Sequence, residues 1–147
     1  MIETPELQKV LPQSYPFMMI DRIVEFKEGE SLTAIKNITS NEWLFEEDTP
    51  TERFFPETLL IEAAAQVALV LYQLSKIPKG EKRPRYILGK VVAEFLERVV
   101  IGDQLMIRAL ANKMMDTGGY SDISLTVNSK KVADIEIIYS VKRESKT

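Results

Sequence analysis

The chain of 147 residues contains no cysteine and no histidine. Without cysteine it can form neither a disulfide framework nor a thiolate nucleophile. Without histidine it lacks Ser-His-Asp and Cys-His nucleophilic machinery, histidine-ligated zinc and imidazole acid–base chemistry. Any proton transfer must therefore depend on carboxylates, lysines, tyrosines or water.

The sequence also lacks a strong net charge and a recognisable targeting segment. Its net charge is -3 with both signs mixed along the chain, so no basic face indicates a nucleic-acid partner. The opening MIETPELQKVLPQ lacks the regions of a signal peptide. The apolar run that begins at Leu59 is shorter than a membrane span and contains Glu62 and Gln66. We expect a cytoplasmic protein without a membrane partner.

The longest apolar segment, FFPETLLIEAAAQVALVLYQL at residues 54–74, is typical of a buried helix. Glu57 begins the helix, where the helix dipole favours a negative charge, and Ser75 lies near its end. Glu62 and Gln66 interrupt the segment one helical turn apart and share one face. A helix that is apolar on all sides must be enclosed by other elements.

Most of the remaining chain has the alternation of β-strands, and length and composition predict one domain over residues 1–147. The expected strands are residues 20–26, 32–38, 85–100, 105–115, 120–128 and 132–142. Turn sequences at 28–30, 116–119 and 128–131 favour antiparallel pairing, and residues 40–56 are expected to form a long loop. The prediction is an α+β fold in which a curved antiparallel sheet wraps one helix. Its exposed edge implies dimerisation.

Four segments, in order, resemble the (3R)-hydroxyacyl-acyl-carrier-protein dehydratases, which have the hot-dog fold. They are LPQSYPFMMIDRI, AIKNITSNEWLF, FPETLLIEAAAQ and VAEFLERVVIGDQL. The resemblance implies a long central helix wrapped by the sheet, and a homodimer or an oligomer of dimers with active sites between chains. It also implies an acyl thioester substrate on acyl carrier protein or coenzyme A, and no cofactor or metal.

By the same resemblance, Glu62 matches the family's helix glutamate and Gln66 the glutamine four residues later. The family's loop motif Gly-His-Phe-Pro-Gly reads Glu-Asp-Thr-Pro-Thr at residues 47–51, so Asp48 occupies the histidine position. Dehydration needs a base at C2 and an acid at the C3 hydroxyl. Asp48 and Glu62 are the candidate catalytic residues, although aspartate, with a reference pKa of about 3.9, is a weaker base than histidine.

Five residues are candidates for substrate binding: Phe55, Pro56, Glu57, Gln66 and Tyr86. The first three align with the family's Met-Pro-Gly, where a backbone amide at the helix start polarises the thioester carbonyl. Glu57 replaces that glycine and narrows the approach. Tyr86 lies where aromatic residues gate the acyl tunnel in the family, and Gln66 can also orient Glu62.

Structural alternatives stand beside these roles. Glu62 can be a buried ion-paired carboxylate, Asp48 a turn residue and Tyr86 part of the core. The basic stretch at residues 76–85 can be a solvated loop or can meet an acidic carrier protein.

Three functions follow from these choices. The first is a noncanonical dehydratase in fatty-acid or specialised lipid biosynthesis. The second is a non-catalytic subunit that binds the acyl carrier, with a variant in which it pairs with a histidine-bearing paralogue. The third is a hot-dog thioesterase, which would use a carboxylate.

Overall fold

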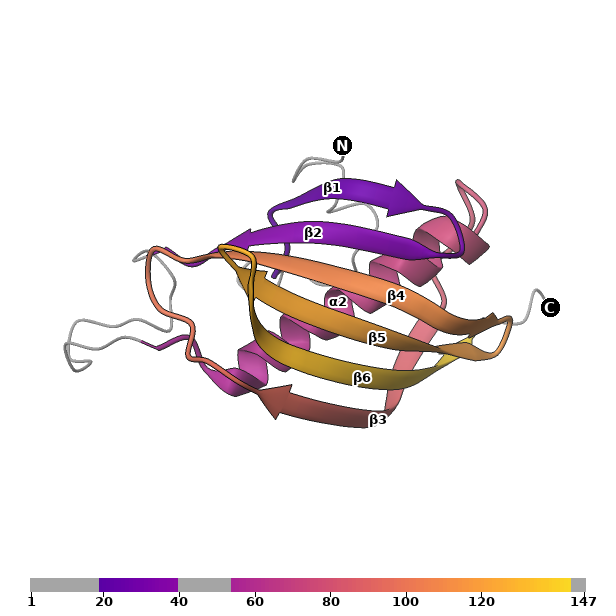
Figure 1. Cartoon of the computed structure of the whole chain (residues 1–147). Coiled ribbons are helices and arrows are strands. Elements are labelled where there is room, and N and C mark those ends of the chain that lie inside the picture. Colours follow the sequence, from indigo (N-terminus) through magenta and orange to yellow (C-terminus); the bar gives the residue numbers. More distant parts are fainter. Residues whose placement is uncertain (1–18, 40–53, 144–147) are drawn as a thin grey trace.

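The computed structural model describes residues 19–39 and 54–143, which form one six-stranded antiparallel sheet and one long helix. The strands lie in the order β1-β2-β4-β5-β6-β3. Figure 1 shows the helix, α2, crossing one face of the sheet, which curves around it. The predicted α+β hot-dog architecture is confirmed. The elements are β1 (Arg22–Lys27), β2 (Ser31–Asn37), α2 (Glu57–Lys76), β3 (Arg85–Phe95), β4 (Gln104–Met115), β5 (Gly118–Val127) and β6 (Lys130–Lys142).

The core lies between α2 and the concave face of the sheet. Every residue of α2 from Ala63 to Tyr72 is buried, and alternate residues of β5 and β6, such as Ile123 and Ile135, point toward it. By length and composition α2 is also long and apolar enough to cross a membrane. Its enclosure by the sheet explains that composition, because a helix surrounded by core has to be apolar on all sides.

Two predicted boundaries are wrong. The strand expected to continue to Val100 ends at Phe95, because the N–H groups of Leu96 and Glu97 both donate to the carbonyl of Val132. The following residues leave the sheet, and a single bridge joins Phe54 to Val100.

The turn expected at residues 116–119 is too long, because both of its glycines belong to β5. A Cβ on Gly118 would lie 2.3 Å from the carbonyl oxygen of Tyr139, and one on Gly119 would lie 2.5 Å from its hydroxyl. Glycine is needed here for the close approach of β6 rather than for a turn. The predicted loop at 40–56 lies mostly outside the described residues.

The sheet ends at two edge strands, β1 and β3. The β3 edge, continued by Leu96, carries four exposed large apolar side chains: Ile87, Leu88, Val92 and Leu96. An edge strand offers unpaired backbone groups, and exposed apolar side chains beside them favour pairing with another strand. The structure thus has an exposed apolar edge at β3, and dimerisation stays a prediction.

Candidate active site

The carboxylate of Glu62 lies on the second turn of α2, half-buried, beside a fully buried glutamine. The side-chain nitrogen of Gln66 donates to Oε1 of Glu62 at 2.9 Å. On its other side the amide oxygen of Gln66 accepts from the backbone N–H of Met19 at 2.7 Å. The predicted pairing of residues four apart is confirmed, and it explains how a carboxylate is held in the most apolar segment of the chain.

Met19 was not expected from sequence. It lies 47 residues from Gln66 and contributes a backbone group, so no residue type signals the contact. It is held in place because Met19 and Ile20 are almost fully buried, and the N–H of Asp21 donates to the carbonyl of Ile35. The segment entering β1 therefore anchors the amide that holds the carboxylate.

The start of α2 is built by Phe55, Pro56 and Glu57, as the sequence predicts. Phe55 is buried, and its N–H donates to the carbonyl of Val99 at 2.7 Å. Pro56 caps the helix without a side-chain hydrogen bond, and its carbonyl accepts from the N–H of Leu60. The exposed Glu57 occupies the first turn, where the partial positive charge of the helix end favours a carboxylate.

These three residues line a groove of about 390 Å³ between the helix start and the segment after β3. The guanidinium of Arg98, on the opposite wall, lies 4.3 Å from the ring centroid of Phe54, a distance typical of cation–π contacts. The described residues that line the groove do not include Glu62, which lies five residues along α2 from Glu57, or about 7.5 Å at the helical rise.

Tyr86 lies at the opposite end of α2 from Glu62. Its hydroxyl donates to the side-chain oxygen of Gln73, which is eleven residues, or about 16 Å, beyond Glu62 along the helix. The structure therefore separates Tyr86 from the carboxylate. Because Tyr86 is half-buried beside Tyr72, burial raises the pKa of its phenol and keeps it neutral.

Three tyrosine rings form a cluster at this end of the molecule. The ring of Tyr72 meets Tyr86 and Tyr139 edge to face, with centroids 6.0 and 5.6 Å apart. Burial raises the pKa of Tyr139, and the neighbouring Ser121 hydroxyl offsets this only in part. Neither the Tyr139 hydroxyl nor the Ser121 hydroxyl has a well-formed hydrogen bond in the described part of the chain.

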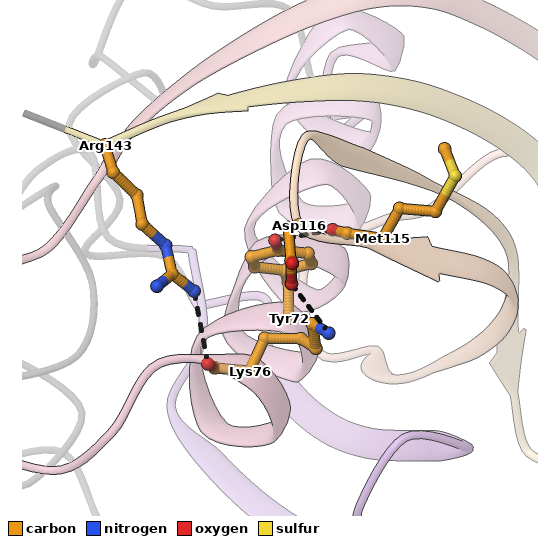
Figure 2. A network of polar contacts seen from close by, with 5 residues as sticks. All are labelled: Tyr72, Lys76, Met115, Asp116 and Arg143. Carbon is orange, nitrogen blue, oxygen red and sulfur yellow. Dashed lines mark hydrogen bonds and ion pairs between the residues drawn. The ribbon is translucent and has the colours of Figure 1, made fainter.

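A polar network closes the same end of α2 (Figure 2). The Tyr72 hydroxyl donates to the carbonyl of Met115 at 2.7 Å, and Nζ of Lys76 lies 3.0 Å from a carboxylate oxygen of Asp116. The guanidinium of Arg143 donates to the carbonyl of Lys76 at 3.4 Å. The hydrogen bond and charge of Lys76 lower the pKa of Asp116. These contacts join the end of α2 to the β4–β5 turn and to the residue that follows β6.

Asp48, the second candidate catalytic residue, lies outside the described residues, so its pairing with Glu62 stays a prediction. Within residues 19–39 and 54–143 no group of three or more acidic side chains is arranged to hold a metal ion.

Sequence comparison identifies close relatives over nearly the whole chain. A dehydratase of Clostridium botulinum (strain Loch Maree / Type A3), named 3-hydroxyacyl-[acyl-carrier-protein] dehydratase FabZ, is 34% identical over 140 residues, which are 95% of this chain and 96% of the relative. The protein of the same name from Listeria monocytogenes serotype 4b (strain CLIP80459) is 31% identical over 141 residues, 96% of each chain.

Solved structures share the fold at low sequence identity. A chain of the dehydratase heterocomplex ApeI:P from Xenorhabdus doucetiae superposes with a TM-score of 0.79 at 12% identity, covering 94% of this chain and 91% of that one. The protein smu.793 from Streptococcus mutans UA159, bound to acetyl CoA, superposes with a TM-score of 0.66 at 16% identity, covering 91% and 98%. The FabA-like domain family matches residues 11–142. The chain therefore belongs to the FabA-like family of hot-dog proteins.

Proposed function

We propose that this protein acts on 3-hydroxyacyl thioesters of acyl carrier protein as a noncanonical dehydratase in fatty-acid or specialised lipid biosynthesis. One observation carries the proposal: a half-buried carboxylate, Glu62, is held by Gln66 in the central helix of a FabA-like domain. The names of the curated relatives supply the reaction class.

In the proposed reaction Asp48 removes a proton from C2 and Glu62 gives a proton to the C3 hydroxyl. The C2 electron pair forms the double bond, the C3–O bond breaks, and the hydroxyl leaves as water. A backbone amide in the first turn of α2, near Glu57, polarises the thioester carbonyl because helix-start N–H groups have no partner within the helix. Two carboxylates can divide acid and base roles when their surroundings differ.

The acyl chain is proposed to run along α2 from Glu62 toward Tyr86. The groove at Phe55 and Pro56 receives the thioester arm, and the Tyr86–Gln73 hydrogen bond limits the far end. No metal or cofactor takes part in these steps, and a cytoplasmic location stays a prediction.

A second copy of the chain is proposed to complete the site by pairing along β3. The exposed Ile87, Leu88 and Val92 on that edge support this arrangement. Size-exclusion chromatography with light scattering tests it: wild type should be a dimer or an oligomer of dimers. The Val92→Lys variant should have a smaller molecular mass in solution than wild type, because pairing along β3 would bury the lysine charge. A wild-type monomer would contradict the proposal.

The missing histidine supports a second candidate, a carrier-binding subunit that lacks its own catalytic base. Such a chain would contribute Glu62 to a shared site with a histidine-bearing paralogue. A protein of similar fold does form a dehydratase heterocomplex, although at 12% identity this likeness concerns the fold.

Hydration of a crotonyl thioester, on acyl carrier protein and on coenzyme A, separates the candidates through loss of enoyl absorbance. Turnover by wild type that is lost in both Asp48→Asn and Glu62→Gln would support the two-carboxylate dehydratase. No turnover by wild type, with activity gained in Asp48→His, would favour the carrier-binding subunit. Release of free thiol would instead indicate a thioesterase.

A further inference from the structure

We infer that the hydrogen-bond chain from Met19 through Gln66 determines which oxygen of Glu62 exchanges a proton with the substrate, namely Oε2. This inference rests on the proposed function, because it assigns an atom within the proposed acid. It makes Gln66 a positioning residue that acts through Glu62.

The first step is the orientation of the Gln66 amide. The backbone N–H of Met19 can only donate, so the group facing it at 2.7 Å must be an acceptor, the amide oxygen. Rotating the amide by half a turn would place its NH₂ group against that N–H. The buried surroundings leave neither donor a water to bond instead, because Gln66 is fully buried and Met19 is 1% exposed.

The second step follows along the amide. With its oxygen on Met19, Gln66 presents only its NH₂ group to Glu62, 2.9 Å from Oε1. An NH₂ group donates and cannot accept. Oε1 is therefore favoured as the acceptor in both protonation states of Glu62, because the carbonyl oxygen of a protonated carboxyl accepts more strongly than its hydroxyl oxygen. When the carboxyl is protonated, its proton is on Oε2.

The chemistry is thereby confined to one oxygen. In elimination, the proton on Oε2 passes to the C3 hydroxyl as the C3–O bond breaks and water leaves. In hydration, Oε2 takes the proton from water as the new C3–O bond forms. The Gln66 donor also steadies the carboxylate that remains after the proton has left.

Gln66→Glu tests the donor and acceptor direction of the hydrogen bonds that run from Met19 through Gln66 to Glu62. The two side chains have almost the same shape. At a pH above its own pKa, which burial and the Glu62 carboxylate raise, the introduced carboxyl is ionised, has no donor for Glu62 and repels it. When protonated, it accepts from Met19 with one oxygen and donates to Glu62 with the other. We expect kcat to fall by about a hundredfold near pH 8 and to recover largely near pH 5, with KM changed by less than about threefold.

The matched control is Gln104→Glu, the same change at an exposed position on β4, which should keep the wild-type pH profile. Gln66→Met, which has no donor, should stay slow at every pH. A Gln66→Glu profile parallel to that of Gln104→Glu would overturn the inference. Gln66→Glu also keeps the test decisive if Gln66→Met does not fold.

A second measurement does not need turnover. The carboxylate infrared band of Glu62, identified by its loss in Glu62→Gln, should shift in Gln66→Met because Oε1 loses its donor, and should stay in place in Gln104→Glu. An unmoved band in folded Gln66→Met would overturn the inference. A shifted band in a protein without crotonyl turnover would support the Gln66 polarity while contradicting the proposed function.

Discussion

The two ends of α2 are built from the same apolar helix but differ in how their polar groups are held. At the C-terminal end Tyr72 and Lys76 reach the β4–β5 turn, and Arg143 covers the last carbonyl. At the N-terminal end Glu62 is half-buried and accepts a hydrogen bond from Gln66 on the same helix face, and the first residues of the helix line a groove.

The polar contacts at the two ends of α2 therefore serve different purposes: those at the C-terminal end stabilise the fold, and those at the N-terminal end position a candidate catalytic group. Polar contacts at the C-terminal end join three elements, so breaking them loosens the fold. The contacts at Glu62 orient one carboxylate. The comparison predicts that changes at the N-terminal end affect chemistry and changes at the C-terminal end affect stability.

Glu62→Gln should have the largest effect and act on activity. If Glu62 is the proton donor, crotonyl hydration should fall by about 10²–10⁴-fold, the usual value of general acid catalysis, while the melting temperature changes little. Enoyl absorbance and a thermal melt measure the two quantities. Glu81→Gln, on an exposed loop, is the matched control. Equal activity in the two variants would remove Glu62 from the mechanism.

Alkaline pH should weaken the C-terminal end of the helix. Burial raises the pKa of Tyr86 and Tyr139 in the folded state above the unfolded value of about 10. Their contribution to stability is complete below that pH and is lost as pH rises through the folded pKa. Urea denaturation should show the free energy of unfolding falling above about pH 10.

The double variant Tyr86→Phe with Tyr139→Phe should reduce that alkaline decline, since neither position could then ionise, and Tyr72, whose pKa burial also raises, should account for part of what remains. Tyr139→Phe alone should cost little at neutral pH, because its hydroxyl has no well-formed hydrogen bond to lose. An unchanged decline in the double variant would assign the alkaline loss to other groups.

Tyr72→Phe should lower stability moderately. It removes the hydrogen bond to the Met115 carbonyl while keeping the ring contacts, so we expect a loss of about 1 kcal/mol in the free energy of unfolding by urea denaturation. Relative turnover should remain near that of wild type. A large loss of activity at unchanged stability would show that the two ends of α2 are coupled.

Asp116→Asn should have the smallest effect. The Asp116 side chain is 84% exposed, so its ion pair with Lys76 contributes little. Because Lys76 lowers the pKa of Asp116, that contribution is present above the unfolded pKa and is lost as pH falls through the folded value. A slight fall in melting temperature at neutral pH should follow, and it should shrink as the pH is lowered below the unfolded pKa. A fall as large as that of Tyr72→Phe would contradict the ranking.

Local sequence pattern was sufficient to predict the helix, most of the strands and the Glu62–Gln66 part of the site. The apolar run predicts α2 almost to its ends, and the spacing of Glu62 and Gln66 predicts their contact, because both depend on residues close in sequence. The β3 boundary and the role of Gly118 were not predictable in this way. Each depends on a strand distant along the chain: the carbonyl of Val132 ends β3, and the backbone of Tyr139 crowds Gly118.

By itself the sequence determined that no histidine or cysteine chemistry is possible and that an enclosed helix carries a carboxylate. Tertiary structure decided the orientation of the Gln66 amide, because the N–H that selects it comes from Met19, brought near only when β1 packs. It also placed Tyr86 beside Gln73 rather than Glu62. The physical reason is that periodicity reports which face a residue occupies, whereas hydrogen-bond partners depend on how distant segments pack.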